Sequence, residues 1–498
     1  MSPLTNDQIN KAFAEAIAAG KSIAKGFTAS SNPIAGAQSY NLETPAQMMY
    51  PVLAPYRNSI PRKEAGFGSQ ANWDAFVGIR QDLNSAGGVE EGKRGGANSH
   101  DLKRYMAAYV TLGAENFVTD EAFKRAKNWG DLLALTARQT TENAMIDQEF
   151  AILGGNASLA LGTCPTPTAV KGTGGALAGG SYSVIAVALT PQGLWSVAGA
   201  NNGATGQRFV GATSRVPGLV SRTNNDGTVT NFNGGSSAPS AAVAVTGVAA
   251  NGTITVTIPN AVRGAAGYAI FVGAAGAEKL NTISRTTVAK ITSESDAAAQ
   301  LASTLTADRS QNSLIHDGLL TIAANESYGS QWVDCAGAAL TPLGGRIAQI
   351  DAILASQWDL YRIQPTRIVV SGLDNQVIGA KILGQSNPNV TYMIDPTSPA
   401  AVTAGRNVGK YMSPITGDLL DIIVHPNMPA GTILLEATRA PSYAQGISNL
   451  VEIECLEDMR MYEWPKTTRR QDYGVYSQCV LKHYFPPALA LITNFSAA

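Results

Sequence analysis

A block of 128 residues in the middle of the chain carries almost no charge. Residues 165–292 contain ten charged side chains, whereas the other 370 residues contain 63. Within the block, short runs rich in β-branched and aromatic residues alternate with Gly, Asn and Pro turns, a pattern typical of a small antiparallel β-sandwich. A Pro-Thr segment at residues 165–168 opens the block. The block is therefore predicted to be a β domain of its own.

The regions on the two sides of this block share a different pattern. Before it, residues 131–154 place apolar side chains at helical spacing and end at a double glycine, which predicts a long helix. After it, helical patterns such as residues 344–363 alternate with apolar strand patterns such as residues 366–372, which predicts a mixed α+β fold. Because the same kind of sequence lies on both sides, the β block is predicted to interrupt a domain.

The N-terminal region is predicted to be an arm that docks on another surface. Residues 5–26 form an amphipathic helical pattern with Ile9, Phe13 and Ile17 on one stripe. An isolated helix of this length is marginal in water, and the polar, proline-containing stretch that follows offers the stripe no partner. Ile9, Phe13 and Ile17 are therefore candidate contacts with another chain.

A long hairpin is predicted next along the chain. Strand-like runs at residues 71–79 and 101–112 flank a glycine-rich, charged segment at residues 84–100. A two-stranded hairpin of this kind is not stable alone, because no third layer covers one of its faces. It must fold back on its own domain or lie across a neighbouring chain, and both alternatives stay open here. The candidate interface residues at its tip are Glu90, Glu91, Lys93 and Arg94.

Nothing in the chain predicts catalysis, a metal site or a cofactor. The four histidines are not spaced with another His, Cys or carboxylate as a zinc site requires. The glycine-rich run at residues 172–180 lacks the spacing of a dinucleotide-binding loop and is interpreted as a linker. The four cysteines are far apart in the sequence, which predicts neither a disulfide framework nor a thiolate zinc site and favours a reducing cytosol. We expect no enzyme and no cofactor.

The charge balance argues against binding of nucleic acid or membrane through the net charge of the whole chain. The formal net charge is −1, so any contact with phosphates must be local. No secretory signal and no run of about 18 apolar residues is found. We therefore expect a protein that folds in a cytoplasm and contacts no membrane.

In the order of its parts, the chain resembles the major capsid protein of tailed bacteriophages, which has the Hong Kong 97 fold. In that family an arm precedes an extended hairpin (the E-loop), a spine helix in the peripheral (P) domain, an axial (A) domain, and a return to P-domain strands. The segments that carry the resemblance follow this order across nearly the whole chain: "PVLAPYRNSIPRKEAGFGSQANW", "GGVEEGKRGG", "LGAENFVTDEA", "ILGGNAS" and "RRQDYGVYSQCVLKHYFPPALALITN". The block with "GGSYSVIAVALTPQG" and "GYAIFVGAAGAEKL" resembles the immunoglobulin- or fibronectin-like domain of some such proteins.

The resemblance implies a domain organisation. The fold class is α+β, a Hong Kong 97-like fold with an inserted all-β immunoglobulin-like sandwich. The expected parts are an N-terminal arm at 1–65, an E-loop hairpin at 66–118, a P-domain spine helix at 119–164, the inserted sandwich at 165–292, an A domain at 293–445, and return P-domain strands with a C-terminal strand at 446–498.

The resemblance also implies a function. The chain is expected to assemble into hexameric and pentameric capsomers of an icosahedral phage head that encloses double-stranded DNA, contacted non-specifically. Expected partners are a separate scaffolding protein, because no long charged pro-segment precedes the arm, together with a portal and a decoration protein. The location would be the virion, with assembly in the host bacterial cytoplasm. Lys93 is suitably placed for the lysine–asparagine cross-link that some relatives form, but no asparagine or assisting carboxylate can be assigned.

A second class of function stays open from the sequence. The low-charge sandwich could be the binding module of a surface or glycan-binding adhesin, with Tyr182, Trp195, Tyr268 and Phe271 as contact residues. Such aromatics more often form the core of a sandwich.

Overall fold

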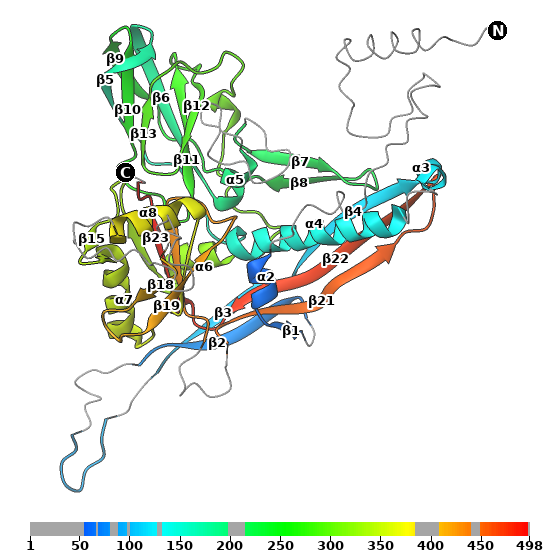
Figure 1. The fold of residues 1–498 in the computed structure, drawn as a ribbon, viewed down its shortest axis with the longest axis vertical. Coiled ribbons are helices and arrows are strands. Elements are labelled where there is room, and N and C mark those ends of the chain that lie inside the picture. Colours follow the sequence, from blue (N-terminus) through cyan, green and yellow to red (C-terminus); the bar gives the residue numbers. More distant parts are fainter. Residues whose placement is uncertain are drawn as a thin grey trace, which may run out of the picture. The chain divides into compact units, whose positions relative to one another are not determined.

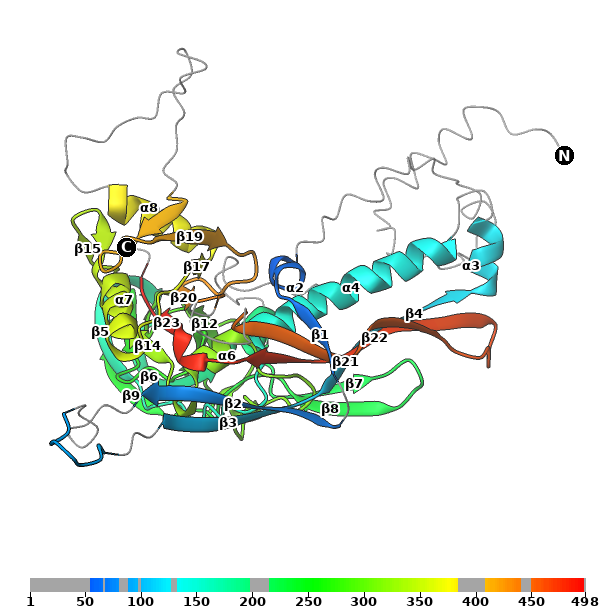
Figure 2. The same ribbon diagram turned by 90° about the horizontal axis from the view of Figure 1, so that it is seen from below.

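The chain mixes helices and strands in an α+β fold, drawn in two views in Figures 1 and 2. Among the helices that the structure describes, none has the length and apolar character needed to span a membrane. The computed structural model describes residues 54–65, 68–79, 88–96, 100–126, 132–197, 215–383, 408–439 and 449–496.

A four-stranded sheet joins residues from before and after the charge-poor block. Its strand order is β1 (Arg62–Glu64), β21 (Val451–Glu463), β22 (Arg470–His483) and β4 (Val110–Thr119), with β1 parallel to β21 and the other pairs antiparallel. Along the first half of β21, buried Val451 and Ile453 alternate with the partly exposed Glu452 and Glu454, the period expected of a strand with one covered face.

One long helix and one short helix pack next to this sheet. Helix α4 (Leu132–Gly154) contacts β4 and β22, and α2 (Pro55–Ser59) contacts α4. The second half of α4 buries Phe150, Ile152 and Leu153 in the same core as the apolar side chains of β21 and β22. Figure 2 shows α4 running along the sheet. The predicted helix at residues 131–154 is confirmed over Leu132–Gly154.

A six-stranded sheet holds a second core. Its strand order is β14 (Gln331–Asp334), β23 (Leu489–Thr493), β20 (Thr432–Glu436), β17 (Arg367–Val370), β19 (Leu419–Val424) and β18 (Lys410–Met412). Strands β20 and β23 are buried along their whole length, as expected for central strands that are covered on both faces. The adjoining elements are α6 (Leu319–Ala324), η6 (Glu326–Tyr328), β15 (Pro342–Leu343), β16 (Arg346–Ile347), α7 (Ala348–Tyr361), α8 (Gly372–Leu383) and η7 (Pro486–Ala488).

The charge-poor block forms two sheets around one apolar core. The first sheet has the order β13 (Val288–Ile291), β10 (Gly252–Thr257) and β5 (Thr168–Leu177), and the second has the order β12 (Lys279–Ser284), β11 (Gly267–Gly273), β6 (Gly180–Leu189) and β9 (Val243–Val248). Side chains of both sheets, including Ile254, Val256 and Ile270, share this core. The boundaries of the block as a domain, and its assignment as immunoglobulin-like, stay predictions.

Four smaller elements complete this region. Helix α5 (Pro191–Ser196) begins at Thr190, whose hydroxyl accepts a hydrogen bond from the Gly193 N–H at 3.2 Å. A separate hairpin is formed by β7 (Leu219–Thr223) and β8 (Val229–Asn233), and η5 (Ala302–Thr304) packs against the second sheet through Ala302.

The predicted hairpin is present as a two-stranded sheet, but its second strand ends earlier than predicted. Strand β2 (Gln70–Ile79) pairs only with β3 (His100–Ala108) in the described part of the chain, and α3 (Asp120–Arg125) follows β4. The single run predicted at residues 101–112 divides at Tyr109, whose N–H donates to the Ser69 carbonyl at 3.2 Å and whose hydroxyl donates to Glu454 at 2.7 Å. These contacts with distant residues, rather than a turn residue in the local sequence, divide the run into two strands.

Two other expectations are wrong. The glycine-rich run interpreted as a linker at residues 172–180 is mostly strand β5, paired with β10. A Cβ at Gly175 would lie 2.3 Å from the Gly252 carbonyl oxygen, so glycine there permits close approach of the strands.

The cysteines do form one disulfide, between Cys455 and Cys479. The register of β21 and β22 places these two residues opposite each other, which their sequence spacing does not reveal.

Candidate functional site: the hairpin tip and the junction of the N-terminal segment

The tip of the β2–β3 hairpin presents charges to solvent. Every residue from 88 to 96 is exposed, including the four predicted interface residues Glu90, Glu91, Lys93 and Arg94. Glu90 and Lys93 form an ion pair within the tip, and the Lys93 N–H donates to the Glu90 carbonyl at 3.0 Å. Gly92, with φ of +78°, supplies the left-handed backbone of this turn. The tip is thus a compact turn with charges of both signs.

The base of the same hairpin is anchored. The Trp73 indole N–H donates to the His483 carbonyl at 3.1 Å, and the Trp73 ring stacks on Tyr105 at 5.9 Å between centroids. Tyr105 is buried and meets Tyr328 edge to face at 5.4 Å. Burial raises the pKa of Tyr105 to about 12. The hairpin is therefore fixed at one end and exposed at the other.

The other predicted contact residues, Ile9, Phe13 and Ile17, lie outside the described residues. The structure does describe the last part of the predicted arm region 1–65, namely residues 54–65; below, the arm means residues 1–53, and residues 54–65 are the segment that follows it. This segment contains α2 and β1, and two clusters of polar residues, neither of which was predicted, hold it against the rest of the chain.

The first cluster centres on a fully buried carboxylate. Glu149 on α4 accepts hydrogen bonds from the backbone N–H groups of Tyr56 at 3.0 Å and Arg57 at 2.8 Å, at the start of α2. His425 Nε2 lies 2.6 Å from the same carboxylate. Because the Asn427 N–H donates to His425 Nδ1 at 3.1 Å, the His425 proton is on Nε2 and is donated to Glu149. Three donors therefore satisfy one buried acid and fix α2 to the long helix.

A second buried acid lies beside the first. Arg367 on β17 donates two hydrogen bonds of 3.0 Å to Glu436 on β20, and its guanidinium lies 5.0 Å from the centre of the Tyr56 ring. The Tyr56 hydroxyl donates to Glu436 at 3.4 Å. Burial, followed by the charge of Glu436, raises the pKa of Tyr56 well above its ordinary value, so that this donor is retained. Residue 56 is thus bonded to both α4 and the six-stranded sheet.

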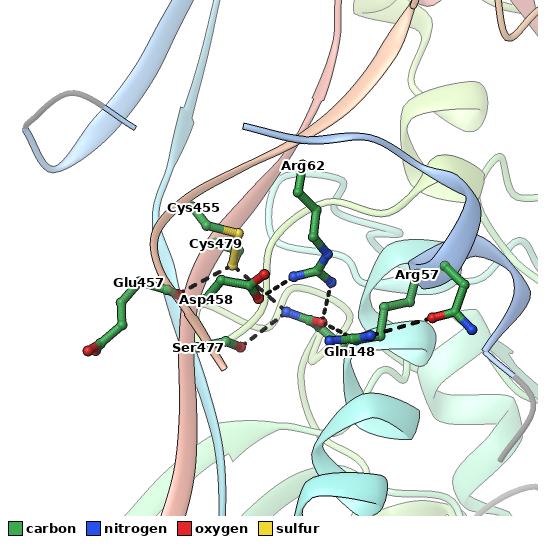
Figure 3. Close-up of polar contacts among 9 residues, drawn as sticks. Arg57, Arg62, Gln148, Cys455, Glu457, Asp458, Ser477 and Cys479 are labelled. Carbon is green, nitrogen blue, oxygen red and sulfur yellow. Dashed lines mark hydrogen bonds and ion pairs between the residues drawn. A yellow bond between two sulfur atoms is a disulfide. The ribbon is translucent and has the colours of Figure 1, made fainter. Parts of the chain in front are cut away.

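The other polar cluster is centred on Gln148, one residue before Glu149 (Figure 3). The Gln148 side-chain oxygen accepts from Arg57 Nε at 3.0 Å and from Arg62 Nη2 at 2.7 Å. Its amide nitrogen donates to Ser477 Oγ at 3.1 Å and contacts Cys479 Sγ at 3.8 Å. One buried side chain on α4 therefore links the segment after the arm to strand β22.

The hydrogen bonds of these clusters hold residues 56, 57 and 62 against helix α4. In the described part of the chain, one group of three residues has ligand atoms close enough for a metal ion: Cys455, Asp458 and Cys479. The two sulfur atoms are bonded to each other, and Asp458 forms an ion pair with Arg62. The donors are thus already engaged.

The aromatic residues proposed for a glycan-binding module do not form a platform. Trp195, Tyr268 and Phe271 are buried, with exposed fractions of 2% or less. Tyr182 is partly exposed, but its hydroxyl is bonded to the Ala178 carbonyl and to Glu294. The prediction that these residues more often form the core is confirmed for three of the four.

Sequence reasoning missed Gln148 and Glu149. A signal for them was present: they end a run of three polar residues, 147–149, in the second half of a helix whose following residues, Phe150 to Leu153, are all apolar. Polar residues inside a stretch that becomes fully buried must have partners there. Their partners, however, come from residues about 90 and 270 to 330 positions away, which no local pattern reveals.

Comparison with solved structures gives matches over most of the chain, whereas no family model and no curated protein matches it. The capsid of an empty GTA particle is 9% identical and has a TM-score of 0.39, with 92% of this chain and 94% of that chain covered. The capsid of Myoviridae phage XM1 is 10% identical at a TM-score of 0.36, covering 92% and 100%. An encapsulin complex from Synechococcus elongatus PCC 7942 is 10% identical at 0.37, covering 94% and 97%. All three TM-scores lie below 0.5, so we base the proposed function on the geometry of the chain itself.

Proposed function

We propose that this chain is a major capsid protein that self-assembles into hexamers and pentamers of an icosahedral phage head around double-stranded DNA. The observation that carries the proposal is the β2–β3 hairpin, anchored at its base by Trp73 and Tyr105 and fully exposed at residues 88–96. An isolated two-stranded ribbon is marginally stable in water. Its missing layer is then supplied by a neighbouring copy of the chain.

The junction after the arm supports the same proposal. Glu149 and Gln148 together fix residues 56, 57 and 62 to the body of the protein. The segment at residues 54–65 is thus held in one position on the body of the protein. A fixed position of this segment is useful for an arm that must reach a defined site on a neighbour, where Ile9, Phe13 and Ile17 would make apolar contacts.

The remaining assignments follow from this function. The β2–β3 hairpin is the E-loop, α4 is the spine helix, and the charge-poor sandwich is an immunoglobulin-like insertion. A near-neutral chain suits a container whose contacts with DNA are non-specific. The proposed partners are further copies of the chain, a separate scaffolding protein, a portal and a decoration protein. The proposed location is the virion, after assembly in the host cytoplasm, and no enzymatic activity is proposed.

Assembly of the purified chain is the direct test. The chain is expressed with and without a candidate scaffold, and the product is examined by light scattering and negative-stain electron microscopy. We expect closed shells or capsomer rings. A folded chain that stays monomeric across salt and protein concentration, with scaffold present, contradicts the proposal.

A charge exchange at the tip tests the interface. The double variant Glu91→Lys, Lys93→Glu keeps the net charge and alters residues that are exposed in the single chain. We expect an unchanged circular dichroism spectrum and impaired assembly. The matched control is Lys290→Glu, Asp296→Lys, which exchanges two exposed charges, one on the insertion and one just after it. Normal shells from the tip variant, or equal impairment in the control, would show that the tip is not an interface.

A further inference from the structure

The disulfide lies at a defined point of the β21–β22 hairpin. Cys455 and Cys479 face each other across the two strands, 24 residues apart in the chain, with their Cα atoms 4.0 Å apart. Both are buried, with exposed fractions of 4% and 3%. The other two cysteines, Cys164 and Cys335, are free. We call the bonded pair Cys455–Cys479 the clasp.

The strand next to the clasp is irregular. Immediately after Cys455 the pairing register of β21 shifts twice, between Cys455 and Glu457 and again between Glu457 and Arg460. Met459 has a positive φ of 35°, an unusual backbone conformation for a residue with a side chain. The irregularity turns Asp458 toward Arg62 on β1, with which it forms an ion pair. The clasp therefore lies at the last regularly paired position of β21 before the irregular stretch that contains Asp458.

Helix α4 and strand β1 meet the β21–β22 hairpin at the clasp, as Figure 3 shows. Gln148 on α4 contacts Cys479 Sγ and Ser477 on one side and accepts from Arg57 and Arg62 on the other. Strand β1 also pairs with β21 up to the clasp, since Glu64 is opposite Cys455. A change in the clasp can thus reach the segment that follows the arm through Gln148, through the Arg62–Asp458 pair and through the strand ladder.

We propose that the clasp is a redox-controlled cross-link that sets how rigidly residues 57–64 are held against helix α4 and strand β21. In the open state both residues are thiols. Closing transfers two electrons to an oxidant of the small-disulfide class, such as oxidised glutathione: two protein thiols and one small disulfide give one protein disulfide and two small thiols. Bond formation removes open conformations of the hairpin.

Burial of the clasp makes its state persistent. Thiol–disulfide exchange requires a thiolate to reach one of the two sulfur atoms. With both cysteines buried, exchange must await separation of β21 from β22. The closed state formed under oxidising conditions is therefore retained after a brief return to reducing conditions, and the segment that follows the arm stays fixed.

A metal site is the competing interpretation of the same residues. Ligand atoms of Cys455, Asp458 and Cys479 lie within 4.8 Å of one another. The structure favours the clasp, because Asp458 is engaged with Arg62 and a tetrahedral zinc site would need a fourth donor. Zinc binding by the reduced chain is an outcome of the test.

The experiment compares the full-length, unassembled chain after oxidised glutathione and after dithiothreitol. Thiols are counted in denaturant without reductant, and peptide mapping identifies the bonded pair. We expect two thiols and a Cys455–Cys479 peptide in the oxidised chain, and four thiols in the reduced chain. Amide hydrogen exchange at residues 57–64 and 451–483 should be about tenfold or more faster in the reduced chain. Cys455→Ser, Cys479→Ser should exchange like the reduced chain under both treatments.

The control is Cys164→Ser, Cys335→Ser, which should keep the full difference between the oxidised and reduced states. If the serine variants do not fold, the proposal is tested by the natural chain alone, whose hydrogen exchange should change reversibly between the oxidised and reduced states. Four thiols after oxidation, or a closed bond with unchanged exchange at residues 57–64, would overturn the proposal. The proposal would also be overturned if zinc ions slowed hydrogen exchange in the reduced chain as much as the disulfide does in the oxidised chain. Because no shells are needed, failure here leaves the proposed capsid function untouched.

Discussion

The chain contains two long antiparallel hairpins that differ in what completes them. In β21–β22, the hairpin is extended by β1 on one side and β4 on the other, is covered by α4, and is cross-linked by Cys455–Cys479. In β2–β3, the two strands pair only with each other among the described residues, and the tip is exposed. One hairpin is completed by its own chain. In the other, the outer edges of β2 and β3 have no further strand beside them among the described residues. These edges and the exposed tip are the reason that we propose it for contacts between chains.

The largest expected difference between the two hairpins is in their contribution to the stability of the single chain. Leu481 on β22 is 2% exposed and lies in the core with α4, whereas Val89 at the β2–β3 tip is 50% exposed. Leu481→Ala should lower the free energy of unfolding by about 2–5 kcal/mol, because it removes buried contacts and leaves a cavity. Val89→Ala should change it by less than about 0.5 kcal/mol. Urea unfolding of the unassembled chain, followed by circular dichroism, measures both; equal costs would remove the distinction.

A pH dependence should arise where the two hairpins meet. Burial lowers the pKa of His483 from 6.5 to about 3. Between these values the unfolded chain binds a proton at this residue and the folded chain does not. Its contribution to stability is therefore fully present above pH 6.5 and is lost as the pH falls toward 3, with a slope of up to about 1.4 kcal/mol per pH unit.

His483→Asn should reduce that slope. The side-chain oxygen of asparagine can replace His483 Nδ1 as acceptor for the Phe485 N–H, which is 3.2 Å away. Free energies of unfolding are measured at pH 7, 6, 5 and 4 for both chains. If the free energy of unfolding fell with pH equally in the natural chain and in the variant, His483 would be protonated without cost in the folded state.

A smaller effect is expected from loosening the base of the β2–β3 hairpin. Trp73→Phe keeps an aromatic ring beside Tyr105 but removes the N–H that donates to the His483 carbonyl. Loss of this hydrogen bond should cost about 0.5–1.5 kcal/mol. Hydrogen exchange should accelerate in residues 70–79 and stay unchanged in residues 451–463. Equal acceleration in the two segments would show that the hairpins are not independent.

The smallest effect is expected from an exposed ion pair on the β2–β3 hairpin. Arg104 donates to Asp74 at 2.8 Å, and this hydrogen bond lowers the pKa of Asp74. Both side chains are exposed, so solvent and salt screen the pair. Asp74→Asn should leave the thermal midpoint of the single chain unchanged. A clear fall in the midpoint at low salt would show that this exposed pair does stabilise the single chain.

The sequence predicted those elements whose signals are local. The long helix at residues 131–154, the helix at 344–363 and the apolar strand at 366–372 correspond to α4, α7 and β17, and all three follow from periodicity. Residue 109 was missed as a division between strands, because Tyr109 is held by Ser69 and Glu454 rather than by a turn. Strand β5 was missed because its glycines, which weaken a strand alone, allow a close neighbour here.

The candidate site was predicted only at its exposed end. Charges and glycines at residues 88–96 indicate an exposed turn whatever the rest of the fold does. By contrast, the roles of Gln148, Glu149 and the clasp depend on residues brought together by the complete fold, such as His425 and Cys479. Periodicity shows that a helix face is buried, but it does not show which polar groups will lie opposite that face.

The pairing of β1 with β21 has a consequence for synthesis of the chain. Arg62 and Asp458, which form an ion pair, are 396 residues apart. At roughly 5–20 residues per second, a ribosome needs about 20–80 s to make that stretch. Throughout that interval residues 54–64 have left the ribosome without their sheet partner, and β4 has no β22 beside it. The four-stranded sheet can form only when translation is nearly complete, so a chain that is cut short before residue 451 exposes unpaired strand edges to its neighbours.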